Sequence, residues 1–137
     1  MNVARGQSRD LSWLITDFTD RVPDVLHAVV VSADGVCLAA SDGIWPERLE
    51  HLSAITAGLA SLAQGSTGIA ERGDIVQTLV SMERAAFVIM AISDGSSLAA
   101  LAGPDADLDQ VAYEMTILTE QAGTVLTPPL RQAAGTE

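Results

Sequence analysis

Apolar residues recur along the chain at two spacings, and these predict the order of helices and strands. Between residues 8 and 22 they recur every three or four positions, as on one face of a helix. Ser8 or Asp10 would cap the start of this helix, and Pro23 would stop it. A second helical pattern begins near Asp105 or Asp107, after the break at Gly103.

Short apolar runs predict strands at residues 26–32, 36–41, 75–82, 85–92 and 98–102. Asp34-Gly35 lies between the first two runs and predicts a hairpin, because glycine accepts a positive φ without steric cost. The run at 85–92 is almost continuously apolar. It therefore predicts a strand that is covered on both faces and central in the sheet.

The longest helical pattern starts at Pro46 and runs from residue 47 to about residue 65, before a predicted loop at residues 65–74. A stripe of mostly large apolar residues is predicted to cover the sheet: Leu49, Leu52, Ile55, Leu59, Leu62 and Ala63. A second stripe of small residues would admit another backbone: Ala54, Ala57, Gly58, Ser61 and Gly65. Glycine inside a helix costs about 1 kcal/mol relative to alanine, so Gly58 favours a packing role.

The predicted order is α-β-β-α-β-β-β-α. Strands joined mostly by hairpins give a largely antiparallel five-stranded sheet, and three helices must cover its two faces. We therefore predict an α/β (α+β) domain, a three-layer α/β/α sandwich, over residues 8–126. Residues 1–7 and 127–137 are predicted to be flexible ends.

Charge narrows the choice of partners. Seven Arg and no Lys stand against 18 Asp plus Glu, for a net charge of −11. So acidic a chain does not resemble a binder of nucleic acid, and anionic membranes are disfavoured for the same reason. A basic protein surface is its natural complement. The absence of Lys also removes Schiff-base chemistry and a Walker lysine.

One acidic motif resembles a metal loop. Asp105-x-Asp107-x-Asp109 looks like the opening of a calcium-binding loop. Gln110 and Thr116, however, occupy the positions where such a loop needs Gly and Glu. Carboxylates are favourable at the positive end of a helix dipole, so a helix start is the better interpretation.

Other reactive side chains stand alone. His27 in a strand fits a satisfied or edge histidine, whereas His51 on the long helix either contacts a partner or faces solvent. Cys37 is the only cysteine and fits a buried small hydrophobe. Neither a nucleophile elbow nor a nucleotide-binding loop is present. We expect no enzyme activity, no catalytic residue, no cofactor and no metal site.

The same patterns bear on location. No apolar run approaches the roughly 20 residues of a membrane span, and the first ten residues lack the apolar core of a signal peptide. We expect a cytoplasmic protein without direct membrane insertion, which partners are free to recruit to a membrane.

Several stretches resemble the roadblock/dynein-light-chain family: Leu26-His-Ala-Val-Val-Val-Ser-Ala-Asp-Gly35, Leu52-Ser-Ala-Ile-Thr-Ala-Gly-Leu59, Thr78-Leu-Val-Ser-Met82 and Ser93-Asp-Gly-Ser-Ser-Leu98. The resemblance covers about residues 8–126 and implies a profilin/roadblock-like fold. Val111-Ala-Tyr-Glu-Met115 and Leu126-Thr-Pro-Pro-Leu-Arg131 are similar to the MglB-like branch of actinobacterial conservon operons. That branch is encoded beside a sensor kinase and a Ras-like GTPase.

The resemblance implies a homodimer in which two sheets join edge to edge and the long helices pack side by side. We expect its interface at Ala54, Ala57, Gly58, Ser61, Gly65, Ile75, Gln77 and Leu79. It also implies a role in signalling: binding a Ras-like, MglA-type small GTPase and modulating its GTP hydrolysis. Candidate contacts to that partner are Glu47, Arg48, Glu50, His51 and Arg72.

Two other functions stay open. A ligand-sensing module would need an interior pocket with a few convergent polar groups. A passive scaffold would join a sensor histidine kinase to other components. Binding to the GTPase in its GDP and GTP forms would separate these functions.

Overall fold

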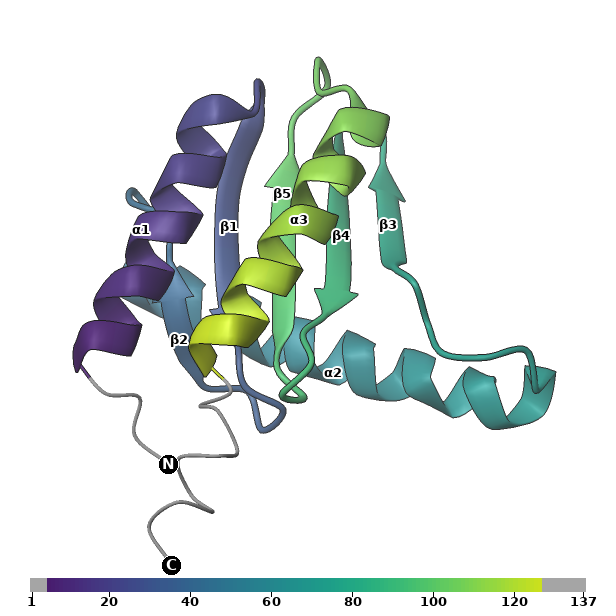
Figure 1. The fold of residues 1–137 in the computed structure, drawn as a ribbon. Helices are drawn as coiled ribbons and strands as arrows, with labels where there is room; N and C mark the ends of the chain where they lie inside the picture. Colours follow the sequence, from purple (N-terminus) through teal and green to yellow (C-terminus); the bar gives the residue numbers. More distant parts are fainter. Residues whose placement is uncertain (1–4, 127–137) are drawn as a thin grey trace, which may run out of the picture.

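The computed structural model describes residues 5–126, with side chains from residue 9 onward. The elements are α1 (Arg5–Arg21), β1 (Val25–Val31), β2 (Cys37–Ala40), α2 (Pro46–Ala70), β3 (Thr78–Met82), β4 (Ala85–Ala91), β5 (Ser97–Ala102) and α3 (Leu108–Leu126). The strands form one sheet in the order β2-β1-β5-β4-β3, and every neighbouring pair is antiparallel. Helices α1 and α3 cover one face and α2 crosses the other (Figure 1). The predicted fold class and order of elements are confirmed.

The first helix starts earlier than predicted. α1 begins at Arg5, so Ser8 and Asp10 lie inside the helix, and their prediction as caps is wrong. Arg and Gln are good helix formers, so the polar residues before Ser8 do not oppose helix formation. Of the ends predicted to be flexible, residues 5–7 belong to α1, and residues 1–4 and 127–137 lie outside the described residues.

Two hairpin turns in the sheet share one geometry. In the β1–β2 turn, the N–H of Gly35 donates to the carbonyl of Ser32 at 3.0 Å, and Gly35 has φ +90°. In the β4–β5 turn, the N–H of Gly95 donates to the carbonyl of Ile92 at 3.0 Å, and Gly95 has φ +96°. Both glycines follow Asp, so the Asp-Gly signal marks the turns because each needs a left-handed residue.

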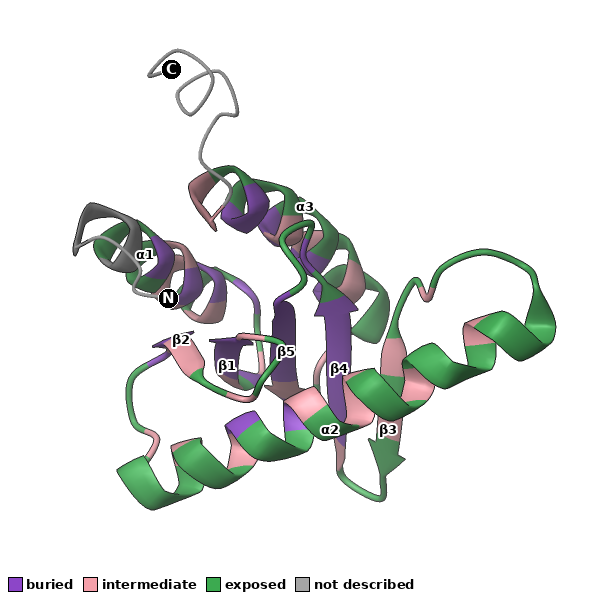
Figure 2. Ribbon diagram, turned by 90° about the horizontal axis from the view of Figure 1, so that it is seen from below, coloured by how far each residue is buried: buried purple, intermediate pink, exposed green. Residues whose placement is uncertain are grey.

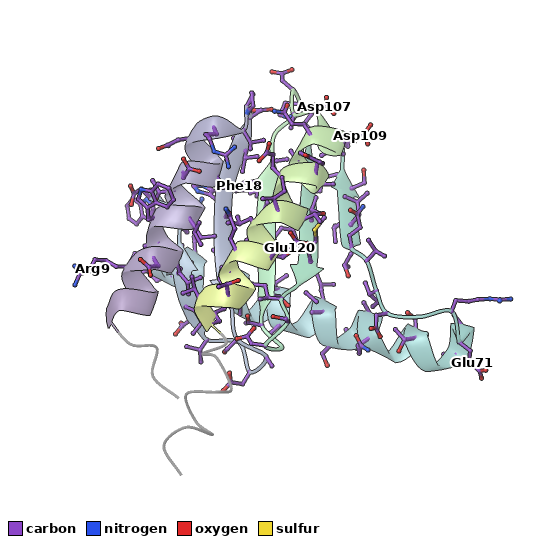
Figure 3. The ribbon with its side chains drawn as sticks, in the orientation of Figure 1. Arg9, Phe18, Glu71, Asp107, Asp109 and Glu120 are labelled. Atoms are coloured by element: carbon purple, nitrogen blue, oxygen red, sulfur yellow. The ribbon has the colours of Figure 1, made fainter. Side chains whose placement is uncertain are left out.

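The main core lies between the sheet and the pair α1 and α3. Leu11, Ile15 and Phe18 of α1 are fully buried in it, and Phe18 points between the two helices (Figure 3). Arg21 ties the helices together, donating to Asp17 at 2.7 Å and to Glu114 of α3 at 3.1 Å. These hydrogen bonds, first to Asp17 and then to Glu114, raise the pKa of the Arg21 guanidinium above its usual value.

A carboxylate fixes the segment between β5 and α3. Asp24 has a left-handed backbone with φ 63°, and its Oδ2 accepts a hydrogen bond from the N–H of Asp105 at 2.7 Å. The N–H of Gly103 donates to the Asp24 carbonyl at 2.8 Å. A Cβ added at Gly103 would lie 2.6 Å from Asp24 Oδ2, so only glycine allows this close approach.

On the opposite face, α2 presents a stripe that differs from the predicted one. Ser53 and Thr56 are buried against the sheet, and their hydroxyls donate to helix carbonyls one turn earlier. Ala57 also packs on the sheet side, 3.8 Å from a Cβ position at Gly35. Side chains packed around this second core include Leu49, Leu52, Ala57, Leu59 and Ala60.

Ile55 and Leu62 do not cover the sheet as predicted, and Leu62 is 79% exposed. The stripe is wrong there because the side of α2 that carries Ser53 and Thr56 meets the sheet, whereas Ile55 and Leu62, seven residues apart, share another side of the helix. Figure 2 shows the exposed surface running along the length of the helix.

The end of α2 also differs from the prediction. The helix continues to Ala70, through the segment predicted as a loop from residue 65. Ser66 and Thr67 donate their hydroxyls to carbonyls three residues earlier, at 2.7 and 2.8 Å, within the helix. Glu71 ends the helix in the left-handed conformation with φ 53°. The last turns therefore project past β3 (Figure 1).

The sheet places its strands as follows. β3 begins at Thr78, so Ile75 and Gln77 precede the strand that they were predicted to join. It is an edge strand of the sheet. β4 is buried along most of its length and lies between two strands, which confirms a strand covered on both faces. The middle strand of the sheet, however, is β5.

Candidate interaction surface

The edge of the sheet at β3 is open for pairing. Thr78-Leu-Val-Ser-Met82 has a neighbour on one side only, β4, and carries neither a charge nor a proline. Natural edge strands normally carry such residues, or are very short or irregular, because a regular apolar edge recruits other strands. The other edge, β2, follows that rule, with four residues and a break in register at Val31. Only β3 therefore offers a regular edge among the described strands.

Large apolar side chains surround this edge. Leu62 is 79% exposed, Ile69 87% and Val76 83%, and Leu79 and Met82 are about half exposed. We call these five residues the edge surface. They come from the end of α2, from the loop after it and from β3, which follow one another on the same side of the molecule (Figure 1). Apolar side chains gathered in this way are typical of an interaction site.

The small residues predicted to meet a second backbone lie beside the edge surface. Ala54, Gly58, Ser61 and Gly65 are exposed, and a Cβ added at Gly58 or Gly65 would meet nothing within 4 Å. The space beside the helix is therefore open at these positions. Ala57 lies apart from them because it packs on the sheet side. Of the other predicted interface residues, Ile75 is half-buried, whereas Gln77 and Leu79 are exposed.

The residues predicted to contact a partner fall into two places. Glu47, Arg48, Glu50 and His51 lie exposed on the first two turns of α2. Arg72 follows the other end of the helix, next to Glu71, which Figure 3 shows at the tip of the projecting end. A rise of about 1.5 Å per residue puts roughly 36 Å between the two places within one protomer. The structure does not bring the five residues together.

A pocket of about 340 Å³ opens at the start of α2. Arg48 and His51 line it from the helix, Trp45 from the residue before the helix, and His27 from β1. Trp45 was not among the predicted contacts, although a Trp directly before the helix-starting Pro46 was a usable signal. His27 was expected to be a satisfied or edge histidine. Instead it lies on an interior strand, and its Nδ1 is buried without a hydrogen-bond partner.

The acidic motif before α3 is a helix cap. Asp107 Oδ1 accepts hydrogen bonds from the N–H groups of Asp109 at 3.1 Å and Gln110 at 3.3 Å. These bonds satisfy N–H groups that a helix leaves unpaired at its start. The interpretation as a helix start is therefore confirmed.

Reactive groups are sparse in the described part of the chain. Cys37 is half-buried, and burial raises the pKa of its thiol, more than hydrogen bonds with Ser53 and the Ala39 carbonyl lower it. Within residues 5–126 no three side chains of His, Cys, Asp or Glu gather where a metal ion could bind. Nor does any helix there combine the length and apolar character of a membrane span.

Comparison with known proteins identifies relatives of this fold. The sequence model of the Roadblock/LC7 domain family matches residues 11–102 of this chain. A Roadblock/LC7 domain from Streptomyces avermitilis is 31% identical, with a TM-score of 0.81 over 87% of this chain and 99% of that chain. No curated protein sequence matches the chain significantly.

Two more distant structures share the fold. MglB from Myxococcus xanthus is 9% identical, with a TM-score of 0.82 over 92% of this chain and 94% of that one. Profilin II from Acanthamoeba castellanii is 14% identical, with a TM-score of 0.56 over 82% of this chain and 93% of that one. At these identities the likeness shows only that the fold is similar.

Proposed function

Because the chain belongs to the Roadblock/LC7 domain family, we propose that it is a homodimeric, non-catalytic regulatory module that binds a Ras-like small GTPase. The resemblance to MglB-like proteins supports the choice of partner and a role in signalling. Modulation of the partner's GTP hydrolysis is part of the same proposal, as is a cytoplasmic location.

The unpaired β3 edge beside the edge surface is the observation that carries this proposal. A second copy would supply hydrogen-bond partners for the β3 backbone and remove an aggregation hazard. It would also remove Leu62 and Ile69 from water, where burial of apolar surface is worth about 25 cal/mol per Å². Dimerisation would therefore account for both the unpaired β3 edge and the exposed apolar side chains beside it.

A twofold axis beside β3 makes the contact self-complementary. Two antiparallel β3 strands would continue the sheet from one copy into the next, because an isologous contact pairs each patch with itself. The projecting end of each α2 would then lie under the other copy's sheet, next to the other copy's α2. The exposed glycines Gly58 and Gly65 would allow the two helices to approach closely.

Sedimentation of the purified chain tests self-association. We expect a dimer at micromolar concentration, and a monomer of 14.3 kDa for Leu62→Glu, because a buried unpaired carboxylate opposes association. Tyr113→Glu is the matched control, since Tyr113 is an exposed large side chain on α3. A monomeric wild type, or a Leu62→Glu variant that stays dimeric, contradicts the proposed contact.

Binding to the GTPase is tested separately. The chain is immobilised and offered a Ras-like GTPase loaded with GDP or with a non-hydrolysable GTP analogue, and hydrolysis of GTP is followed in a parallel assay. Binding that depends on the nucleotide supports a regulator. Binding that ignores the nucleotide supports a passive scaffold, and no binding to either form contradicts the proposed partner.

A further inference from the structure

The pocket at the start of α2 has a charge character opposite to that of the chain. The chain carries a net charge of −11, yet none of the described residues that line this pocket is Asp or Glu. Three nitrogen-bearing side chains converge there instead, from Arg48, His51 and His27. A cationic guanidinium with imidazole groups beside it is suited to a carboxylate, which accepts two N–H bonds from Arg.

These polar groups have unused hydrogen-bonding capacity. Within residues 9–126 Arg48 forms no ion pair, although Glu47 and Glu50 are close in sequence, whereas Arg21 forms two. The Nδ1 atom of His27 is buried and has no hydrogen-bond partner in the described residues. Because this nitrogen is closed off from solvent, a ligand in the pocket cannot reach it unless the His27 ring moves, and the polar groups open to a ligand are those of the exposed Arg48 and His51.

The remaining walls are apolar and open on one side. Ile44, Leu52, Ile55 and Leu101 line the pocket, and Trp45 beside it is 72% exposed. Sites for small molecules bury most of the ligand surface. A half-open pocket with Trp and Arg at its rim instead fits a side chain on a larger body, because such residues dominate protein–protein contacts.

We infer that this pocket receives a large apolar side chain flanked by carboxylates, presented by a short acidic segment of a protein partner. The apolar side chain lies against Leu52, Ile55 and Trp45, and one carboxylate pairs with Arg48 and His51. The inference rests on the proposed function only in that the segment belongs to the docked partner. The pocket itself lies at the other end of α2 from Ile69 in the edge surface.

Short peptides test the pocket without any GTPase. The ¹⁵N-labelled full chain is titrated with acetyl-Asp-Leu-Asp-amide, and amide shifts are followed by NMR. Acetyl-Asn-Leu-Asn-amide removes the carboxylates, and acetyl-Asp-Ala-Asp-amide removes most of the apolar side chain. We expect saturable shifts at Gly43, Trp45, Arg48 and His51 with the first peptide, and much weaker binding of the other two.

Two variants are expected to weaken the binding of acetyl-Asp-Leu-Asp-amide. Arg48→Gln removes the charge, and we expect about a tenfold loss of affinity, the size of one charge-assisted hydrogen bond. Trp45→Ala removes a wall without removing a helix cap, because the Trp45 side chain makes no cap hydrogen bond. Arg84→Gln, at an exposed arginine in the β3–β4 turn, should leave binding unchanged.

Several results would overturn the inference. They are absent shifts, equal binding of the uncharged peptide, shifts centred on Arg72, or full binding by Arg48→Gln. Equal binding of free 4-methylpentanoate would assign the pocket to a small molecule, and binding only to phosphatidylserine vesicles would assign it to a membrane. If the peptide binds and the GTPase does not, the proposed partner is rejected and the pocket remains a binding site. If the GTPase binds and the peptide does not, only the inference about the pocket is rejected.

Discussion

On the face of the sheet under α1 and α3, apolar side chains such as Phe18 and Leu11 are fully buried within one protomer. On the face under α2, the helix buries the hydroxyl side chains of Ser53 and Thr56 and leaves Leu62 in solvent. The same five strands therefore carry a completed core on one side and a partial one on the other.

One arginine on each face adds a contrast. Arg21 on the completed face is paired with carboxylates of α1 and α3, whereas Arg48 on the α2 face forms no ion pair among the described residues. Exposed aromatic residues do occur on the completed face, at Trp13 and Tyr113. The difference lies in what accompanies them: within residues 9–126 the buried polar atom without a partner, His27 Nδ1, lines the pocket at the start of α2, and the other end of α2 lies near the open β3 edge. One face supplies stability, and we expect the other to supply binding.

The largest expected effect comes from the completed core. Phe18→Ala should lower the free energy of unfolding by about 3–5 kcal/mol, because a fully buried ring leaves a cavity. Leu62→Ala, on the other face, should change monomer stability by less than about 0.5 kcal/mol. Urea denaturation at protein concentrations below the dimer dissociation constant measures both changes in monomer stability. Similar losses for the two variants would erase the distinction between the faces.

An intermediate effect is expected where Asp24 holds the segment before α3. Gly103→Ala should cost about 1–3 kcal/mol, because the new methyl displaces the Asp24 carboxylate from the N–H of Asp105. In an Asp24→Gly background the same substitution should cost less, since the clashing carboxylate is gone. Urea denaturation of the four proteins gives the coupling. Strictly additive losses would show that the contact is not responsible.

The glycines of α2 give a smaller effect that separates monomer from dimer. In the Leu62→Glu background, Gly58→Ala should raise the free energy of unfolding by about 1 kcal/mol, since nothing lies within 4 Å of the new Cβ. In the dimer the gain should vanish, because the second copy occupies that space. Gly68→Ala is a comparison site with equal room in the protomer. Equal stabilisation by Gly58→Ala in both backgrounds would show that the contact between the two α2 helices lies elsewhere.

The smallest effect concerns the β1–β2 turn, where Ser32 donates a hydrogen bond to the exposed Asp34 carboxylate. This bond, followed by one from the Asp34 backbone, lowers the pKa of Asp34, so its contribution to stability is present at neutral pH and is lost as the pH falls through the lowered pKa. Ser32→Ala should raise the pKa of Asp34 toward its ordinary value. Carboxyl NMR titration measures the change, and an unaltered pKa would contradict it.

Local signals predicted much of the fold. Asp34-Gly35 and the apolar runs marked the strands, since a hairpin is decided by a few adjacent residues. The end of α2 was mispredicted because the glycines at 65 and 68 suggested a loop, whereas Ser66 and Thr67 bond within a continuing helix. Propensity alone does not decide where a helix with few tertiary contacts stops.

The candidate site was less predictable. Four of the predicted partner contacts do share the start of α2, because neighbours on a helix stay close. The pocket beside them joins His27, Trp45 and Leu101, which are far apart in the sequence and meet only through strand order.

The strand order has a kinetic consequence. The pairs β1–β2, β3–β4 and β4–β5 each join neighbours in sequence, whereas β1 pairs with β5 across a long stretch of chain that includes α2. Pairing of strands that are distant in sequence loses the entropy of closing a large loop before the favourable contacts form. It is therefore slow relative to hairpin formation. We therefore expect the zipping of Val29 to Ala99, and of the residues beside them, to set the folding rate of the chain.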